Sequence, residues 1–198
     1  MIVIHPYDIT TTFLNGLYEG WEGVELLTQR NSNSEIRRAL NHRVYEAENI
    51  MMLGHGCEYG LFADTSPSRK FDQLIINGSH VDFLRKTICI GIWCNADMFA
   101  DKYGLTGLFT GMIVSEMEEA LLYGIQANED EIRTENQRLA ELFVRAFKEC
   151  KYLADIPAFF QDNAPMDTPL QYFNYNNIHY FGAKDKSTKS TFHPLQDR

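Results

Sequence analysis

The sequence predicts an α/β domain, a three-layer sandwich in which helices cover both faces of a mostly parallel sheet of five or six strands. Short runs of almost wholly apolar residues, typical of strands buried on both faces, alternate along the chain with segments of helical spacing. The composition is that of a globular protein, since 44% of the 198 residues are hydrophobic and 23% are charged. We therefore expect a single domain over residues 1–182, followed by a polar tail over residues 183–198.

In the first half of the chain, strands are expected where the apolar runs lie, at residues 1–5, 23–28 and 49–53. Helices are expected over residues 11–21 and 34–43, the second with an N-cap among Ser32, Asn33 and Ser34. Residues 57–72 contain glycine, proline and several polar side chains, which predict a loop. A short strand over 74–76 and a short helix over 79–86 follow.

In the second half, the apolar runs at residues 87–93 and 108–114 predict two more strands. A helix over 95–103 lies between them, and Gly104 ends it. Ser115 and Glu118 have the spacing of a capping box, which predicts a helix to about residue 123. Asn128 and Glu131 predict the start of a longer helix to about residue 150. Residues 170–181 are expected to form an edge strand or a loop that covers the sheet.

Charge and composition exclude several classes of function. The net charge is −9 and the basic residues are scattered, so we expect no nucleic-acid partner. No apolar run approaches the length of a membrane span and no secretory signal is evident, so we expect a cytoplasmic protein without membrane association. The four cysteines are then expected to be thiols. Nucleotide-binding motifs are absent from the sequence, and we expect no cofactor.

Two reactive side chains, His55 and Cys94, each follow a predicted buried strand, 39 residues apart. Because the carboxyl ends of parallel strands meet at one edge of a sheet, these side chains are expected to meet there as general base and nucleophile. Gly56 allows a close backbone approach, and its N–H is a candidate oxyanion donor. Cys94 precedes a predicted helix start, where the helix dipole favours a thiolate.

The pattern resembles the caspase-like cysteine peptidases, the group that includes caspases, metacaspases and gingipains. In that group an apolar strand ends in His-Gly, and a second apolar strand, about forty residues on, ends in the nucleophilic cysteine. Residues 51–56 and 88–94 match the two motifs, and the likeness extends over about residues 1–125. The resemblance implies a caspase-like fold, a peptide or protein substrate, and a catalytic dyad of His55 and Cys94.

Other readings of the same residues stay open. Trp93 stands where the group usually has a small or acidic residue, and together with the small size it favours a non-catalytic interaction or sensory module. A flavodoxin-like domain that binds a small ligand at the same edge is a third reading. His55, Cys57 and Cys94 lack a fourth ligand for a structural zinc, so no metal site is expected. The acidic stretch over 116–131 is read as a solvated helix surface or as a selector of basic substrate side chains. The sequence does not determine the oligomeric state.

Overall fold

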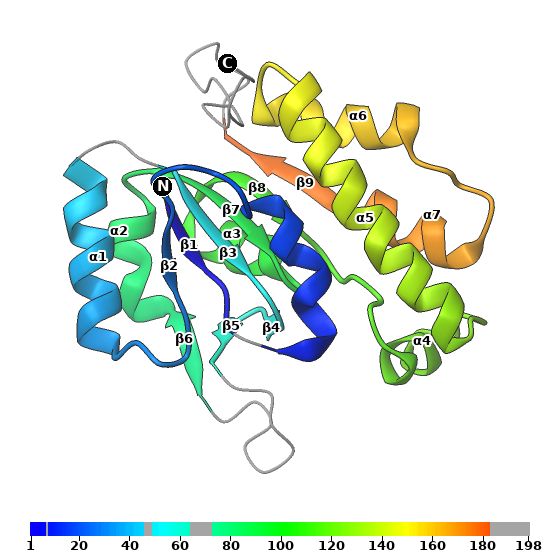
Figure 1. The fold of residues 1–198 in the computed structure, drawn as a ribbon, viewed down its shortest axis with the longest axis horizontal. Helices are drawn as coiled ribbons and strands as arrows, with labels where there is room; N and C mark the ends of the chain where they lie inside the picture. Colours follow the sequence, from blue (N-terminus) through cyan, green and yellow to red (C-terminus); the bar gives the residue numbers. More distant parts are fainter. Residues whose placement is uncertain (7, 46–48, 64–72, 183–198) are drawn as a thin grey trace.

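A six-stranded sheet forms the centre of the protein, in the order β2-β1-β3-β7-β8-β9 (Figure 1). The computed structural model describes residues 1–6, 8–45, 49–63 and 73–182. Five strands run parallel and β9 pairs antiparallel with β8 at one edge. The strands are β1 (Ile2–Ile4), β2 (Glu25–Leu27), β3 (Ile50–Leu53), β7 (Ile88–Ile92), β8 (Thr106–Thr110) and β9 (Ile178–Phe181). The predicted α/β class and the mostly parallel sheet are confirmed.

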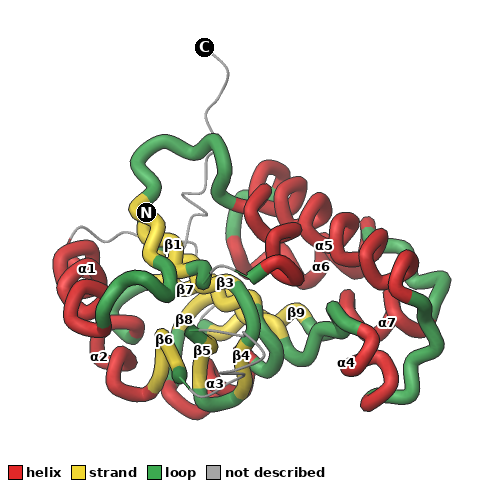
Figure 2. Tube along the Cα trace, turned by 60° about the horizontal axis from the view of Figure 1, so that its bottom comes forward, coloured by secondary structure: helices red, strands yellow, loops and turns green. Residues whose placement is uncertain are grey.

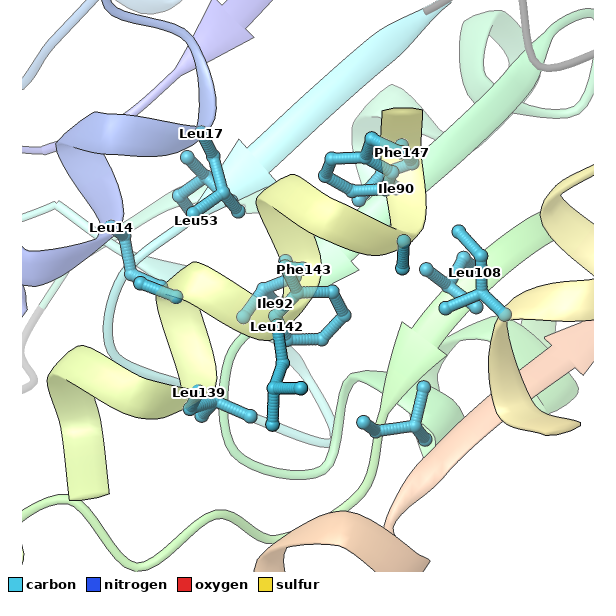
Figure 3. Packing of buried hydrophobic residues seen from close by; sticks show 14 of the residues in the cluster. Leu14, Leu17, Leu53, Ile90, Ile92, Leu108, Leu139, Leu142, Phe143 and Phe147 are labelled. Carbon is cyan, nitrogen blue, oxygen red and sulfur yellow. The ribbon is translucent and has the colours of Figure 1, made fainter. Parts of the chain in front are cut away.

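Two hydrophobic clusters cover the two faces of this sheet, because successive side chains of a strand point to opposite faces. On one face the strands pack against the 3-10 helix η1 and the helices α5, α6 and α7 (Figure 3). On the other face they pack against α1, α2 and α3. The bounds are η1 (Ile9–Leu17), α1 (Asn33–Tyr45), α2 (Val81–Leu84), α3 (Ala96–Tyr103), α5 (Glu129–Glu149), α6 (Ile156–Asn163) and α7 (Pro169–Asn176).

A second, antiparallel sheet follows β3; its first two strands lie mostly where the sequence predicted a loop, and its third confirms the short strand predicted over residues 74–76. It has the order β4-β5-β6, with β4 (Gly56–Cys57), β5 (Gly60–Phe62) and β6 (Leu74–Asn77), and β4 contacts α3 (Figure 2). Strands of two and three residues are too short to produce a periodic sequence pattern, which is why the loop prediction was wrong for residues 57 and 60–62. Residues 58, 59 and 63 form turns or bends, as predicted, and residues 64–72 lie outside the described residues.

Several helix ends match the sequence signals and others do not. Gly104 adopts a left-handed conformation (φ 63°) at the end of α3, and Asn128 with Glu131 forms the capping box of α5, both as predicted. The capping box of the helix α4 (Met117–Leu122), however, joins Glu116 and Glu119, one residue later than predicted. The shift turns the Glu119 carboxylate toward the N-terminus of α4.

The C-terminal part holds more helix than the sequence predicted. Residues 170–176 belong to α7, which Thr168 caps, and the predicted edge strand is confined to β9. The strand predicted over residues 108–114 lies earlier, in β8, because residues after Thr110 leave the sheet and bond to the chain around α7: Gly111 N–H donates to the Asn177 carbonyl. No helix in the described ranges combines the length and apolar character that crossing a membrane requires. The predicted tail, 183–198, lies outside the described residues.

Candidate functional site

The strands that precede His55 and Cys94 are direct neighbours and are paired in register. Leu53 of β3 lies opposite Ile92 of β7, and the Gly54 N–H donates to the Ile92 carbonyl at 3.1 Å. His55 and Cys94 therefore leave the sheet at the same level. Leu53 and Ile92 both face the layer of η1 and α5, so positions two residues further along each strand are expected on that same face.

His55 and Cys94 line one small cavity, together with side chains of η1 and α5 such as Leu14 and Leu139. The cavity has a volume of about 20 Å³. That is room for about one water molecule and not for a peptide. The structure thus places His55 and Cys94 at the same cavity, and that cavity is too small to admit a substrate.

The His55 ring is held by a hydroxyl and two carboxylates. Its Nε2 lies 2.6 Å from Thr10 Oγ1, 3.4 Å from Glu116 Oε1 and 3.9 Å from Asp8 Oδ1. Thr10 and Asp8 come from the start of η1, where Asp8 is the N-cap and accepts from the Thr10 N–H at 2.8 Å. The imidazole side chain is 11% exposed, so these contacts fix its orientation at the edge of the site.

The hydrogen bonds of the Thr10 hydroxyl determine which ring nitrogen of His55 carries the proton. The Thr10 hydroxyl donates its single proton to Asp8 Oδ1 at 2.6 Å, so it can only accept from the ring. The neutral ring therefore carries its proton on Nε2 and donates it to Thr10. Nδ1 is then the basic nitrogen, and it has no hydrogen-bond partner within the described part of the chain. The arrangement leaves one ring nitrogen able to accept a proton.

The Cys94 thiol faces a carboxylate. Its single S–H proton has two acceptors within reach of Sγ, the Ile113 carbonyl at 3.4 Å and Glu119 Oε1 at 3.5 Å. Burial raises the pKa of the Cys94 thiol far above its ordinary value, and the charges of Glu119 and Glu116 raise it further. The helix N-terminus that follows Cys94 was expected to favour a thiolate. In this arrangement burial and the carboxylates outweigh it, and the thiol is neutral.

Glu119 is held beside the thiol by the N-terminus of α4. Its Oε2 accepts from the Ser115 N–H at 2.7 Å, the Ser115 hydroxyl at 3.0 Å and the Glu116 N–H at 3.2 Å. The same capping box that starts α4 therefore positions the group that keeps Cys94 protonated.

Gly56, the candidate oxyanion donor, lies in β4 against the Trp93 indole. A Cβ at this position would come within 2.1 Å of Trp93 Cδ1 and 2.6 Å of the Gly60 carbonyl oxygen. The indole Nε1–H donates to the Cys57 carbonyl at 3.1 Å, and the Trp93 backbone bonds through both its N–H and its carbonyl to the Thr110 hydroxyl. Trp93 thus packs the His55–Cys57 segment against the end of β7.

A second histidine, His5, follows β1 next to the site. Its ring contacts the Tyr18 hydroxyl at 3.0 Å and Thr11 Oγ1 at 3.3 Å. Burial lowers the pKa of His5 to about 4, the Asp8 charge opposes this, and His55 lowers it further. His5 is therefore neutral at pH 7 and acts as a buried hydrogen-bonding group.

Sequence reasoning missed four residues around the pair: Asp8, Thr10, Glu116 and Glu119. Asp8 and Thr10 carry a local signal, because an N-cap Asp follows β1, which ends at the same edge of the sheet as β3. Glu116 and Glu119 lie in the acidic stretch that was interpreted as a solvated helix surface or as a selector of basic substrate side chains. Their contact with the site depends on where the start of α4 lies in the folded chain, which no local pattern gives.

Within the described ranges, no three side chains among His, Cys, Asp and Glu are grouped so as to hold a metal ion. Comparison with known proteins finds no matching family model, no matching curated protein and no matching solved structure.

Proposed function

We propose that this chain is a caspase-like cysteine peptidase that hydrolyses peptide bonds through Cys94 and His55. The observation that carries the proposal is the pairing of β3 with β7, in register, so that both side chains line one cavity. The motif of an apolar strand ending in His-Gly beside an apolar strand ending in Cys supports the caspase-like assignment. The free Nδ1 of His55 supplies a proton acceptor.

In the proposed reaction the Cys94 sulfur attacks the peptide carbonyl carbon and its proton passes to Nδ1 of His55. The N–H groups of Gly56 and Cys94 stabilise the oxyanion of the tetrahedral intermediate. Collapse of the intermediate breaks the C–N bond, and the leaving amine takes the proton from His55. Water then attacks the thioester carbon while His55 accepts a proton from it; the C–S bond breaks, the acid product leaves, and the proton on His55 returns to the Cys94 sulfur.

The described arrangement corresponds to a resting form of this enzyme. The Cys94 thiol donates to Glu119 rather than to His55, and the cavity is too small for a peptide. Attack therefore requires the thiol to turn away from Glu119. Because Glu119 is bound to the first turn of α4, a small displacement of residues 113–119 would open the cavity and release the thiol together.

A peptide-library cleavage assay tests the proposal. Wild-type protein is expected to cleave a subset of the library, and Cys94→Ala and His55→Ala are expected to abolish this cleavage. A Cys150→Ala variant is the matched control, since Cys150 lies at the far end of α5 and its loss should change nothing. Cleavage that persists in Cys94→Ala, or no cleavage by the wild type, would reject the proposal.

A second candidate function, a non-catalytic interaction or sensory module, is favoured by the raised pKa of Cys94. Labelling with iodoacetamide at pH 6 distinguishes the two. Burial raises the pKa of Cys89 to about 12 and that of Cys150 to about 11, so neither thiol should react quickly. Because Glu119 holds the wild-type thiol neutral in either case, the Glu119→Gln variant is labelled. Faster labelling of Cys94 than of Cys150 in that variant supports a peptidase, and equal or slower labelling supports the non-catalytic module.

A further inference from the structure

The first turn of α4 contacts both members of the reactive pair. Glu116, the residue that precedes the helix, lies with its Oε1 3.4 Å from Nε2 of His55. Glu119 lies with its Oε1 3.5 Å from the Cys94 sulfur. Because both carboxylates belong to one capping box, a displacement of α4 as a unit changes the surroundings of His55 and Cys94 together.

Few apolar side chains attach α4 to the rest of the protein. In this helix, all of whose residues are described, only Ala120 is buried, and Met117 is partly buried. Both pack in a small hydrophobic cluster that is separate from the two clusters on the faces of the sheet. Figures 1 and 2 show α4 beside α7, which contributes Leu170 to that cluster. A segment with so little buried apolar surface opens at a lower free energy than the core does.

The large apolar side chains of α4 face the solvent instead. Leu121 is 73% exposed, Leu122 is 78% exposed, and Tyr123, which ends the helix, is 44% exposed. The Tyr123 ring contacts the Phe173 ring of α7, and the residue before Phe173, Tyr172, is 63% exposed. We call Leu121, Leu122, Tyr123 and Tyr172 the apolar patch. Single exposed leucines are ordinary, but this helix buries its alanine and exposes both of its leucines, an arrangement that does not stabilise the fold.

A carboxylate borders the apolar patch and indicates what kind of partner fits it. Glu118 is exposed and precedes Leu121 and Leu122 by three and four residues, the spacing that places side chains on one face of a helix. A complementary segment therefore carries apolar side chains with lysine or arginine beside them.

A second copy of this chain fits the apolar patch poorly. It would bring its own Glu118 and its net charge of −9 to the contact, and like charges repel. A stable dimer also requires about 800 Å² from each partner, contributed by about 20–30 residues, whereas the patch has four side chains. A short segment of another protein matches the patch in both charge and size.

We infer that the apolar patch is a docking site for a short basic and apolar segment of a partner protein, and that docking displaces α4 from the reactive pair. Displacement uncovers Ala120 and Met117, so a segment bound to displaced α4 buries more apolar surface than one bound to α4 in place. A ligand shifts an equilibrium toward the state that it binds more tightly. The inference rests on the proposed function for its consequence, in which the partner activates the peptidase by removing Glu119 from Cys94.

Thiol labelling of the wild-type chain tests the inference without any need for cleavage. The probe is the acetylated peptide amide Leu-Lys-Lys-Leu-Leu-Lys-Leu-Leu-Lys-Lys-Leu, and the control peptide has glutamate in place of each lysine. At a saturating concentration of the lysine peptide, iodoacetamide is expected to label Cys94 at least about threefold faster, because Glu119 no longer faces the thiol. The glutamate peptide is expected to leave the labelling rate unchanged.

Paired variants locate the docking site. Leu121→Ser with Leu122→Ser is expected to weaken binding of the fluorescein-labelled lysine peptide about 10-fold to 100-fold, measured by anisotropy, and to abolish its effect on labelling. Leu26→Ser is the matched control, since Leu26 is an exposed leucine of the edge strand β2. Its Kd and labelling rate should equal those of the wild type. Glu118→Gln should weaken the lysine peptide by up to about fivefold.

Three results would overturn the inference. The lysine peptide could leave the labelling rate of Cys94 unchanged, or it could raise that rate equally in the wild type and in the leucine double variant. Sedimentation could also show a wild-type dimer that the double variant does not form, in which case the apolar patch binds a second copy.

The outcomes also separate this inference from the proposed function. Faster labelling with the lysine peptide, in a protein that cleaves no library peptide with or without it, keeps the docking site and rejects the peptidase. Cleavage by the wild type, together with a labelling rate that the lysine peptide does not change, keeps the peptidase and rejects the docking site.

Discussion

Replacing Glu119 by glutamine is expected to activate the Cys94 thiol. The Glu119 Oε1 lies 3.5 Å from the Cys94 sulfur. Two unit charges at that distance repel by about 1 kcal/mol at the dielectric constant of water and about 5 kcal/mol at an effective value of 20. Removing the carboxylate charge therefore lowers the pKa of Cys94, while glutamine keeps the capping interaction at the start of α4.

The expected size of the effect follows from these energies. With a tenfold change for each 1.4 kcal/mol, the thiolate fraction rises at least about fivefold. Because a less basic thiolate is also less nucleophilic, the alkylation rate rises by less, about 3-fold to 80-fold. The assay is iodoacetamide labelling below neutral pH, read by mass spectrometry with fragment ions that separate Cys94 from Cys89.

Glu118→Gln is the matched control for this experiment, since it makes the same change in net charge on α4 but Glu118 is exposed. Its labelling rate at Cys94 is expected to equal that of the wild type. If Glu119→Gln and Glu118→Gln label at the same rate, the thiol is not governed by Glu119 and the resting arrangement described above is refuted.

Three further predictions concern the surroundings of the pair. The pKa of His5 is about 4 in the folded protein against 6.5 for an ordinary histidine, so the unfolded chain gains a proton first as the pH falls. Wild-type stability, measured by urea unfolding, should therefore fall by about 3 kcal/mol more than that of His5→Gln between pH 6.5 and pH 4. Gly56→Ala should destabilise the protein by about 1–3 kcal/mol because the new methyl group meets the indole ring, whereas Gly16→Ala, with nothing within 4 Å, should be neutral or stabilising. Thr10→Val removes the hydroxyl that accepts from Nε2 of His55, so the neutral ring should no longer favour the tautomer with its proton on Nε2. The ¹⁵N chemical shifts of the imidazole report which tautomer is populated.

Each of these predictions has an outcome that contradicts it. A parallel pH dependence for wild type and His5→Gln would mean that His5 does not titrate differently in the two states. Equal thermal stability of Gly56→Ala and Gly16→Ala would mean that the Trp93 ring moves to make room for the new methyl group without destabilising the protein. An unchanged ¹⁵N pattern in Thr10→Val would mean that the hydroxyl does not set the tautomer.

The meeting of His55 and Cys94 at one edge of the sheet could be predicted from the sequence because both parts of the signal are local. A buried parallel strand is visible as a short apolar run, and His55 and Cys94 directly follow two such runs. Gly104 and Asn128 were predicted for a similar reason, since a helix end is determined by its own cap residues. Most of the central sheet followed from the same patterns.

The environment of the pair could not be predicted because it arises from long-range packing. Glu119 reaches Cys94 only because the start of α4 lies beside the end of β7 in the folded chain, and the capping box that holds it is offset by one residue from the one the sequence suggested. The short strands β4 and β5 were missed because two or three residues carry no periodicity. Helix α6 follows Asp155 with Pro157 near its start, a position where proline is compatible with a helix.

Covalent trapping of Cys94 tests the central claim most directly. The protein is incubated with a set of peptidyl acyloxymethyl ketones that vary the residue before the ketone, and adducts are located by mass spectrometry. If His55 and Cys94 form a catalytic dyad, a single adduct appears on Cys94, is absent from Cys94→Ala and forms at least about a hundredfold more slowly in His55→Ala. An adduct that forms at the same rate without His55, or that falls equally on Cys57 and Cys150, would contradict the account.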